Sequence, residues 1–168
     1  MPFETPDLLD PSERVPDRLE REQFLLRPLT PDDAGLDYDA VTESGERLHG
    51  TFGSDDEWPT GLSETQNRVD VCWHYKEHQR RDAFTYGVFD TEGTVELGCL
   101  YVQPTTVTEY DAAVYYWVSD AAIDRGLAAA IETASREWIA RAWPFERVAY
   151  PGRDVPWAEW PPAGTDGQ

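Results

Sequence analysis

The residues best suited to chemistry are two histidines in one polar segment, His74 and His78. They stand four residues apart and enclose Glu77, in the pattern H-x-x-E-H. On a helix this spacing places both imidazoles on one face, where they could bind zinc beside a carboxylate that activates water. Such a site also needs a third ligand, and the neighbouring Arg80 and Arg81 favour an exposed helix with ion pairs. We therefore predict that the chain binds no metal.

Three apolar segments are rich in aromatic and β-branched residues: 83–90, 94–104 and 112–118. This composition is typical of strands, and the turn residues Asp90 to Gly93 predict a hairpin between the first two. The third segment is too apolar for a strand with one face in water, which indicates the buried centre of a sheet. Tyr115 and Tyr116 within it must point to opposite faces, so one of them is expected to reach a cleft.

Capping and periodicity signals predict the elements around these strands. In chain order they are a strand at 24–29, a helix at 30–41, a helix at 63–81, a long helix at 123–143 and a short strand at 147–150. Ser63 to Gln66 form the capping box of the second helix, whose apolar face is expected to hold Leu62, Val69 and Trp73. This order of elements indicates an α/β domain with a central sheet.

The chain of 168 residues is long enough for one domain with a sizeable core. Prolines and charges predict a loosely ordered arm at 1–22, followed by a single domain at 23–160 and a flexible tail at 161–168. Aromatic residues near the end could clasp the chain's own core or bury a partner's surface, as in a homodimer: Trp143, Phe145, Trp157 and Trp160.

The chain is strongly acidic, with 33 Asp and Glu against 14 Lys and Arg and a formal net charge of −19. Lys76 is the only lysine, a composition typical of salt-adapted archaea, so we expect a haloarchaeal source; a melting temperature indifferent to molar KCl would contradict this. The charge argues against nucleic acids and anionic membranes as partners. Without a signal-peptide pattern or a membrane-spanning apolar run, a cytoplasmic protein is expected.

Several stretches resemble the GNAT N-acetyltransferase superfamily. FLLRPLTPDDA resembles its opening strand and helix, FTYGVFDTEGTVELGCLYVQP its paired second and third strands, and AAVYYWV its fourth strand. The resemblance covers residues 24–150. It implies a mixed, mainly antiparallel central sheet flanked by helices, shortened after the fifth strand at 147–150.

The resemblance also implies that acetyl-CoA binds between the fourth and fifth strands. In the family, backbone N–H groups of a glycine-containing loop after the fourth strand hold the pyrophosphate. The loop at the matching position is 119–126, and backbone N–H groups near 117–119 would polarise the thioester carbonyl. The expected cofactor-binding residues are therefore Trp117, Val118, Ser119, Arg125 and Gly126. Only Arg125 and Gly126 keep the character of that loop, and Asp120 and Asp124 would bring negative charge toward a phosphate.

Direct transfer of an acetyl group to an amine needs mainly positioning, together with a group that takes the amine's proton. The resemblance implies a base among Glu96, Glu109 and Asp111 at the strand ends, and Tyr116 is the candidate side chain in the cleft. We therefore expect an acyl-CoA-dependent N-acetyltransferase that acts on a small-molecule or peptide amine. The altered loop and the short C-terminal part support an alternative, a non-catalytic module that binds a ligand or another protein.

Overall fold

The computed structural model describes residues 7–162 of the chain. Its centre is a six-stranded sheet in which the strands follow one another in chain order. They are β1 (Leu19–Glu20), β2 (Leu25–Pro28), β3 (Phe84–Phe89), β4 (Glu96–Gln103), β5 (Ala112–Val118) and β6 (Val148–Ala149). All neighbouring strands are antiparallel except β5 and β6, which are parallel. The predicted fold class, a mixed and mainly antiparallel sheet flanked by helices, is confirmed.

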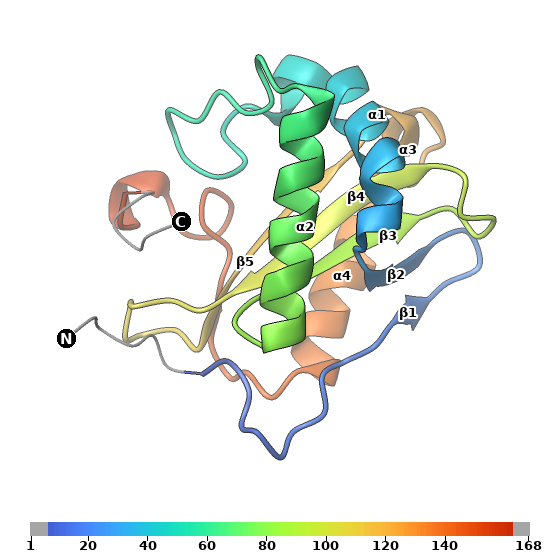
Figure 1. Ribbon diagram of the computed structural model, residues 1–168. Helices are drawn as coiled ribbons and strands as arrows, with labels where there is room; N and C mark the ends of the chain where they lie inside the picture. Colours follow the sequence, from blue (N-terminus) through green and yellow to red (C-terminus); the bar gives the residue numbers. More distant parts are fainter. Residues whose placement is uncertain (1–6, 163–168) are drawn as a thin grey trace.

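Helices cover both faces of this sheet (Figure 1). Helices α1 (Ala34–Ser44) and α2 (Glu64–Arg80) lie on one face, and α4 (Ala128–Ala142) lies on the other. The short helix α3 (Asp120–Asp124) connects β5 to α4. Three 3-10 segments complete the structure: η1 (Pro31–Asp33), η2 (Gly45–Leu48) and η3 (Trp157–Glu159). No helix in the described part of the chain is long and apolar enough to cross a membrane.

Strand β5 contributes side chains to a core on each face of the sheet, because successive residues of a strand point to opposite sides. Val114 and Tyr116 belong to the apolar cluster that includes Ile131 of α4. Trp117 belongs to the cluster that includes Val41 of α1. Burial on both faces explains why nearly every residue of β5 is apolar or aromatic.

The described part of the segment at 1–22 packs against the domain. Leu8 and Leu9 are buried in the cluster on the α4 side, and β1 pairs with β2. The Arg81 guanidinium donates hydrogen bonds to the backbone carbonyls of Asp10 and Glu13, at 3.1 and 2.7 Å. These contacts attach residues from 7 onward to the sheet and to α2, whereas residues 1–6, and 163–168 of the predicted tail, lie outside the described residues.

Helix α2 begins where the capping signal predicts but buries a different face. Ser63 Oγ accepts a hydrogen bond from the backbone N–H of Gln66 at 3.0 Å. Val69 and Trp73, which were expected to be buried, are 55% and 53% exposed. The buried positions of the helix are instead Asn67, Val71 and His78. Val69 and Trp73 are therefore wrongly assigned, because polar side chains with hydrogen-bond partners take the inner positions. Leu62 is partly buried and packs against the cluster on the α1 side.

The two histidines of the H-x-x-E-H pattern lie in different environments. His78 is buried, its Nδ1 accepts a hydrogen bond from the N–H of Thr85 at 3.3 Å, and its ring packs edge-on against Phe84. Burial lowers the pKa of His78, so the imidazole is neutral. His74 Nδ1 lies 3.7 Å from a Glu77 oxygen. Within residues 7–162, no group of three or more His, Cys, Asp or Glu side chains is arranged to hold a metal ion.

The helix predicted at 123–143 is two helices. Helix α3 ends at Asp124, and Gly126 has a φ of +70°, a left-handed conformation that favours glycine. The N–H of Leu127 then bonds to the carbonyl of Ala122 at 2.9 Å, and α4 begins at Ala128. The prediction of one continuous helix is wrong because the glycine lets the chain turn after α3.

Gly98 in β4 is required by the close approach of β5. A Cβ atom at this position would lie 2.5 Å from the backbone oxygen of Trp117, in the register where Gly98 faces Val118. We expect Gly98→Ala to lower the free energy of unfolding by about 1–3 kcal/mol, the usual cost of overpacking a core. Urea unfolding of the purified variant measures this change.

The matched control is Gly35→Ala in α1, where nothing lies within 4 Å of the added Cβ. Alanine is a better helix former than glycine, so this variant should gain up to about 1 kcal/mol. A Gly98→Ala protein as stable as the wild type would contradict the packing described for β4 and β5.

Candidate functional site

The sheet opens between its last two strands. β5 and β6 form two residue pairs, from Ala112 and Ala113, whereas β5 continues to Val118. Beyond these pairs, no described strand bonds to the edge of β5 that faces β6. The carbonyl groups of Tyr116 and Val118 both point to this open edge, because residues two apart in a strand have the same orientation.

Two arginines take the place of the missing strand. Arg153 Nη2 donates a hydrogen bond to the carbonyl oxygen of Tyr116 at 2.9 Å. Arg47 Nη2 donates to the carbonyl oxygen of Val118 at 2.6 Å, and its Nε bonds to an Asp120 oxygen at 2.6 Å. Both open carbonyl groups are therefore satisfied by donors from the chain itself.

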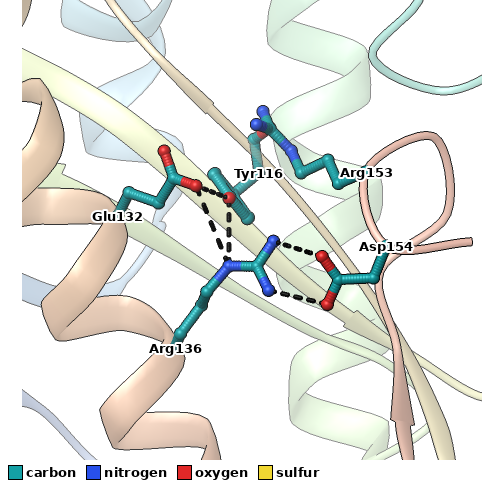
Figure 2. Close-up of polar contacts among 5 residues, drawn as sticks. All are labelled: Tyr116, Glu132, Arg136, Arg153 and Asp154. Carbon is teal, nitrogen blue, oxygen red and sulfur yellow. Dashed lines mark hydrogen bonds and ion pairs between the residues drawn. The ribbon is translucent and has the colours of Figure 1, made fainter.

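The side chain of Tyr116 lies in a polar cluster between β5, α4 and the segment after β6, as Figure 2 shows. Its hydroxyl bonds to Glu132 at 2.6 Å and to Arg136 Nε at 3.2 Å. Arg136 donates two hydrogen bonds to Asp154, at 2.8 and 3.1 Å, and the Arg153 guanidinium carbon lies 3.7 Å from the centre of the Tyr116 ring. Burial and the Glu132 hydrogen bond raise the pKa of Tyr116, so its hydroxyl stays protonated at neutral pH.

The segment after β6 that carries Arg153, residues 151–157, is what we call the C-terminal strap. At its end, the ring of Trp157 stacks on Tyr115, with centroids 6.3 Å apart and an interplanar angle of 18°. Because Tyr115 and Tyr116 point to opposite faces, the strap contacts β5 at its edge and on both faces. In Figure 1 the segment that follows β6 accordingly runs beside β5.

The loop after β5 is closed by its own hydrogen bonds. Ser119 Oγ accepts a bond from the N–H of Ala122 at 3.2 Å, and the Ser119 N–H donates to the Leu97 carbonyl at 2.9 Å. Arg125 is exposed and lies 3.7 Å from a carboxylate oxygen of Asp90. Ser119 therefore caps α3.

This conformation does not fit acetyl-CoA. The edge of β5 between the two diverging strands already holds an arginine at each carbonyl, and the strap lies against that edge. Asp120 and Asp124 add negative charge to the loop that the resemblance assigns to the phosphates. The residues expected to bind the cofactor lie between 117 and 126. In this conformation the carbonyl of Val118 and the hydroxyl of Ser119 bond to other groups of the chain, so they are not available to a cofactor.

On the opposite face of the sheet, Glu96 and Asp37 form a pair of buried carboxyl groups, 1% and 5% exposed. Asn67 donates a hydrogen bond to Asp37 at 3.0 Å, whereas no donor among the described residues reaches either oxygen of Glu96. Burial and the neighbouring Asp37 carboxylate raise the pKa of Glu96, and burial raises the pKa of Asp37. Both pKa shifts favour a protonated carboxyl group in this pair, and the larger shift is at Glu96.

A small cavity of about 50 Å³ adjoins Asp37. Its polar and aromatic lining residues are Asp37, Phe52, Trp58, Asn67, Asp70, His74 and Tyr101. The Phe52 ring packs edge-on against Trp58 and Tyr101, with centroids 5.2 and 5.1 Å away. Trp117 lies behind this wall and donates its indole N–H to the Tyr101 hydroxyl at 2.9 Å. Buried carboxyl groups beside aromatic rings suit a small cation.

The structure separates the three predicted catalytic residues. Tyr116 lies on the α4 side of the sheet, and Glu96 lies on the α1 side next to Asp37. Glu109 is exposed in the loop between β4 and β5. No two of the three share one site.

The sequence did not point to Arg47, Arg153 or Asp37. The two arginines reach β5 from 71 and 37 residues away, and Asp37 meets Asn67 across 30 residues. The sequence held one signal for the arginines. In a chain with 33 acidic and only 14 basic residues, each arginine is expected to have a partner within the fold.

Neither a family model nor a curated protein matches this sequence. Solved structures do share its fold. The ribosomal-protein-S5-alanine acetyltransferase from Vibrio fischeri is 14% identical, and the match covers 74% of this chain and 68% of that one with a TM-score of 0.58. The ribosomal L7/L12 alpha-N-protein acetyltransferase RimL, in complex with coenzyme A, is 19% identical over 73% of this chain and 66% of that one, with a TM-score of 0.57.

A third structure is described as a GNAT-family acetyltransferase from Bordetella pertussis. It is 16% identical over 76% of this chain and 74% of that one, with a TM-score of 0.53. The chain has the GNAT fold. At identities this low the likeness establishes the fold, and the activity of this chain has to be argued from its own residues.

The raised pKa of Glu96 leads to a pH-dependent prediction. Above the unfolded pKa of about 4.3, the folded protein keeps this proton while the unfolded chain loses it. The free energy of unfolding therefore falls as pH rises toward the folded pKa, by up to about 1.4 kcal/mol per pH unit. Glu96→Gln keeps a side chain of nearly the same size and has no proton to lose. We expect it to match the wild type near the unfolded pKa and to be more stable at neutral pH, measured by urea unfolding across pH.

Glu109→Gln is the control, because it removes the same type of carboxyl group from an exposed loop. Its stability should follow the wild type at every pH. A Glu96→Gln protein that is less stable than the wild type at neutral pH would mean that a charged Glu96 stabilises the fold, contrary to the raised pKa of this residue.

Proposed function

We propose that this chain is an acyl-CoA-dependent N-acetyltransferase, which moves an acetyl group from the sulfur of CoA to an amine nitrogen. The observation that carries the proposal is the open edge of β5, from which β6 diverges after two residue pairs. The fold is shared with RimL, which has been solved with coenzyme A, and this likeness supports a cofactor position between β5 and β6.

The cofactor contacts are proposed on the stretch from the end of β5 to the end of α3. Trp117, Val118 and Ser119 would lie beside the cofactor chain, with Arg125 and Gly126 near the pyrophosphate. The Arg125 side chain is 45% exposed and its Asp90 partner is 3.7 Å away, so the guanidinium is free to exchange a carboxylate for a phosphate.

The acceptor is proposed to be a primary amine of a small molecule or peptide, bound as its ammonium form in the cavity beside Asp37. The carboxyl groups and aromatic walls of the cavity favour a cation. The Asp37–Glu96 pair would then take the ammonium proton. Tyr116 lies on the other face of the sheet, apart from this cavity. Its raised pKa keeps the hydroxyl protonated, and it is the proposed acid for the leaving CoA thiolate at the edge of β5.

The net charge of the chain determines the salt concentration at which this activity should be assayed. A net charge of −19 repels the phosphates of CoA in dilute buffer. Salt shortens the range of that repulsion from about 10 Å at 0.1 M to about 3 Å at 1 M. We infer a cytoplasmic enzyme of a salt-loving organism, to be assayed in molar KCl.

A second candidate function is a non-catalytic module that keeps the GNAT fold and binds a ligand or a partner protein. The hydrogen bonds from Arg153 to Tyr116 and from Arg47 to Val118 favour it, because they fill the strand edge that a cofactor would need.

Thermal unfolding with acetyl-CoA in molar KCl tests the proposed cofactor. We expect millimolar acetyl-CoA to raise the melting temperature, since a ligand at about 100 times its Kd stabilises a protein by about 2.7 kcal/mol. Arg125→Gln should reduce this shift. Arg141→Gln, which removes the same charge from an exposed position near the end of α4, should leave it unchanged.

Release of the free CoA thiol in the presence of primary amines separates the two candidates. Thiol release that depends on the amine supports the enzyme, and binding without release supports the module. The proposed function is wrong if acetyl-CoA neither binds nor loses its acetyl group. This result must hold both for the wild type and for a variant in which the contacts of the C-terminal strap are weakened.

A further inference from the structure

The C-terminal strap is held over the open edge of β5 by contacts at the protein surface. The Arg136 and Asp154 side chains, which form its ion pair, are 30% and 54% exposed. Arg153 is also exposed, although its guanidinium bonds to the Tyr116 carbonyl. Ion pairs at the protein surface can break and form again without unfolding the domain.

The strap is nevertheless shaped to its position. Gly152 has a φ of +80°, and a Cβ atom there would lie 2.4 Å from the Trp157 ring. The N–H groups of Arg153 and Asp154 both donate to the Tyr150 carbonyl at 3.0 Å, which closes the turn after β6. This tight turn directs the Arg153 side chain toward Tyr116 of β5. It also places the Trp157 indole against Tyr115, on the opposite face of the strand.

Arg153 occupies a position that a strand-like ligand would use. The Tyr116 carbonyl can accept a hydrogen bond from an amide N–H, and the linker of CoA carries amide groups of this kind. While Arg153 donates to that carbonyl and stacks on the Tyr116 ring, the edge is closed to such a donor. Binding of the linker at this edge and closure of the strap therefore exclude each other.

We propose that the C-terminal strap is a reversible cover of the acyl-CoA site, latched by Asp154 on Arg136 and by Arg153 on β5. The inference rests on the proposed function, because it requires a cofactor that lies along β5. The described conformation is the closed state, and acyl-CoA binds only the open state. Cofactor binding then shifts the protein toward the open state, and the apparent affinity is reduced by the fraction of molecules that are open.

Titration calorimetry with acetyl-CoA in molar KCl tests the strap through Asp154→Asn, which weakens the ion pair with Arg136. A strap that is closed about 90% of the time weakens binding about tenfold, so the variant should bind up to about tenfold more tightly than the wild type. The matched control is Glu159→Gln, which removes one negative charge close to the strap, from a side chain with no hydrogen bond or ion pair among the described residues. Its Kd should equal that of the wild type.

A measurement on the wild type covers the case in which the variant folds poorly. Hydrogen exchange at the amides of Arg153 and Asp154 should be slower in the free protein than after acetyl-CoA is added, because both donate to Tyr150 while the strap is closed. Equal Kd values for all three proteins, with unchanged exchange at these amides, would overturn the strap and leave the proposed function standing. Failure of all three proteins to bind would overturn the proposed function and the strap with it.

Discussion

The open edge of β5 is the constraint on which this end of the molecule depends. Carbonyl groups at a strand edge need donors, and β6 runs alongside β5 for two residue pairs only. Arg47 and Arg153 supply donors farther along the strand. The other contacts follow from this requirement, since Arg136 and Asp154 hold the strap that brings Arg153 to Tyr116. A ligand with N–H groups could donate to these carbonyls in place of the arginine side chains. The open edge of β5 can therefore either be covered by the strap or bind a ligand.

The charge of the chain determines how an anionic ligand would compete for this edge. In a protein with a net charge of −19, the arginines around β5 are already bonded to the chain's own acceptors. Arg136 bonds to Asp154, and Arg47 bonds to Asp120 as well as to a carbonyl. A phosphate would therefore have to displace a carboxylate, and its affinity depends on the difference between the two bonds. Salt screens both bonds, so its main effect is to shorten the range over which the chain's other carboxylates repel the phosphate.

Sequence signals that depend on near neighbours predicted most of the strands and helices. The features that were not predicted depend mainly on contacts between residues far apart in the sequence. The Ser63 capping box placed the start of α2 correctly, because a cap depends on neighbours within one turn. Val69 was assigned to the wrong face of that helix because partners for buried polar groups cannot be read from periodicity. Gly126 was present in the sequence, but its left-handed conformation, which lets the chain turn between α3 and α4, was not predicted from it. Asp37 and Arg153 acquire their roles from partners 30 and 37 residues away, which no motif records.

The most direct test of this account is a crystal structure of the protein grown with acetyl-CoA in molar KCl. The account predicts that the cofactor lies between β5 and β6, that its linker bonds to the Tyr116 carbonyl, and that Arg153 has turned away with the strap. Acetyl-CoA bound elsewhere, with the hydrogen bond from Arg153 to Tyr116 intact, would contradict the claim that the strap covers the cofactor site.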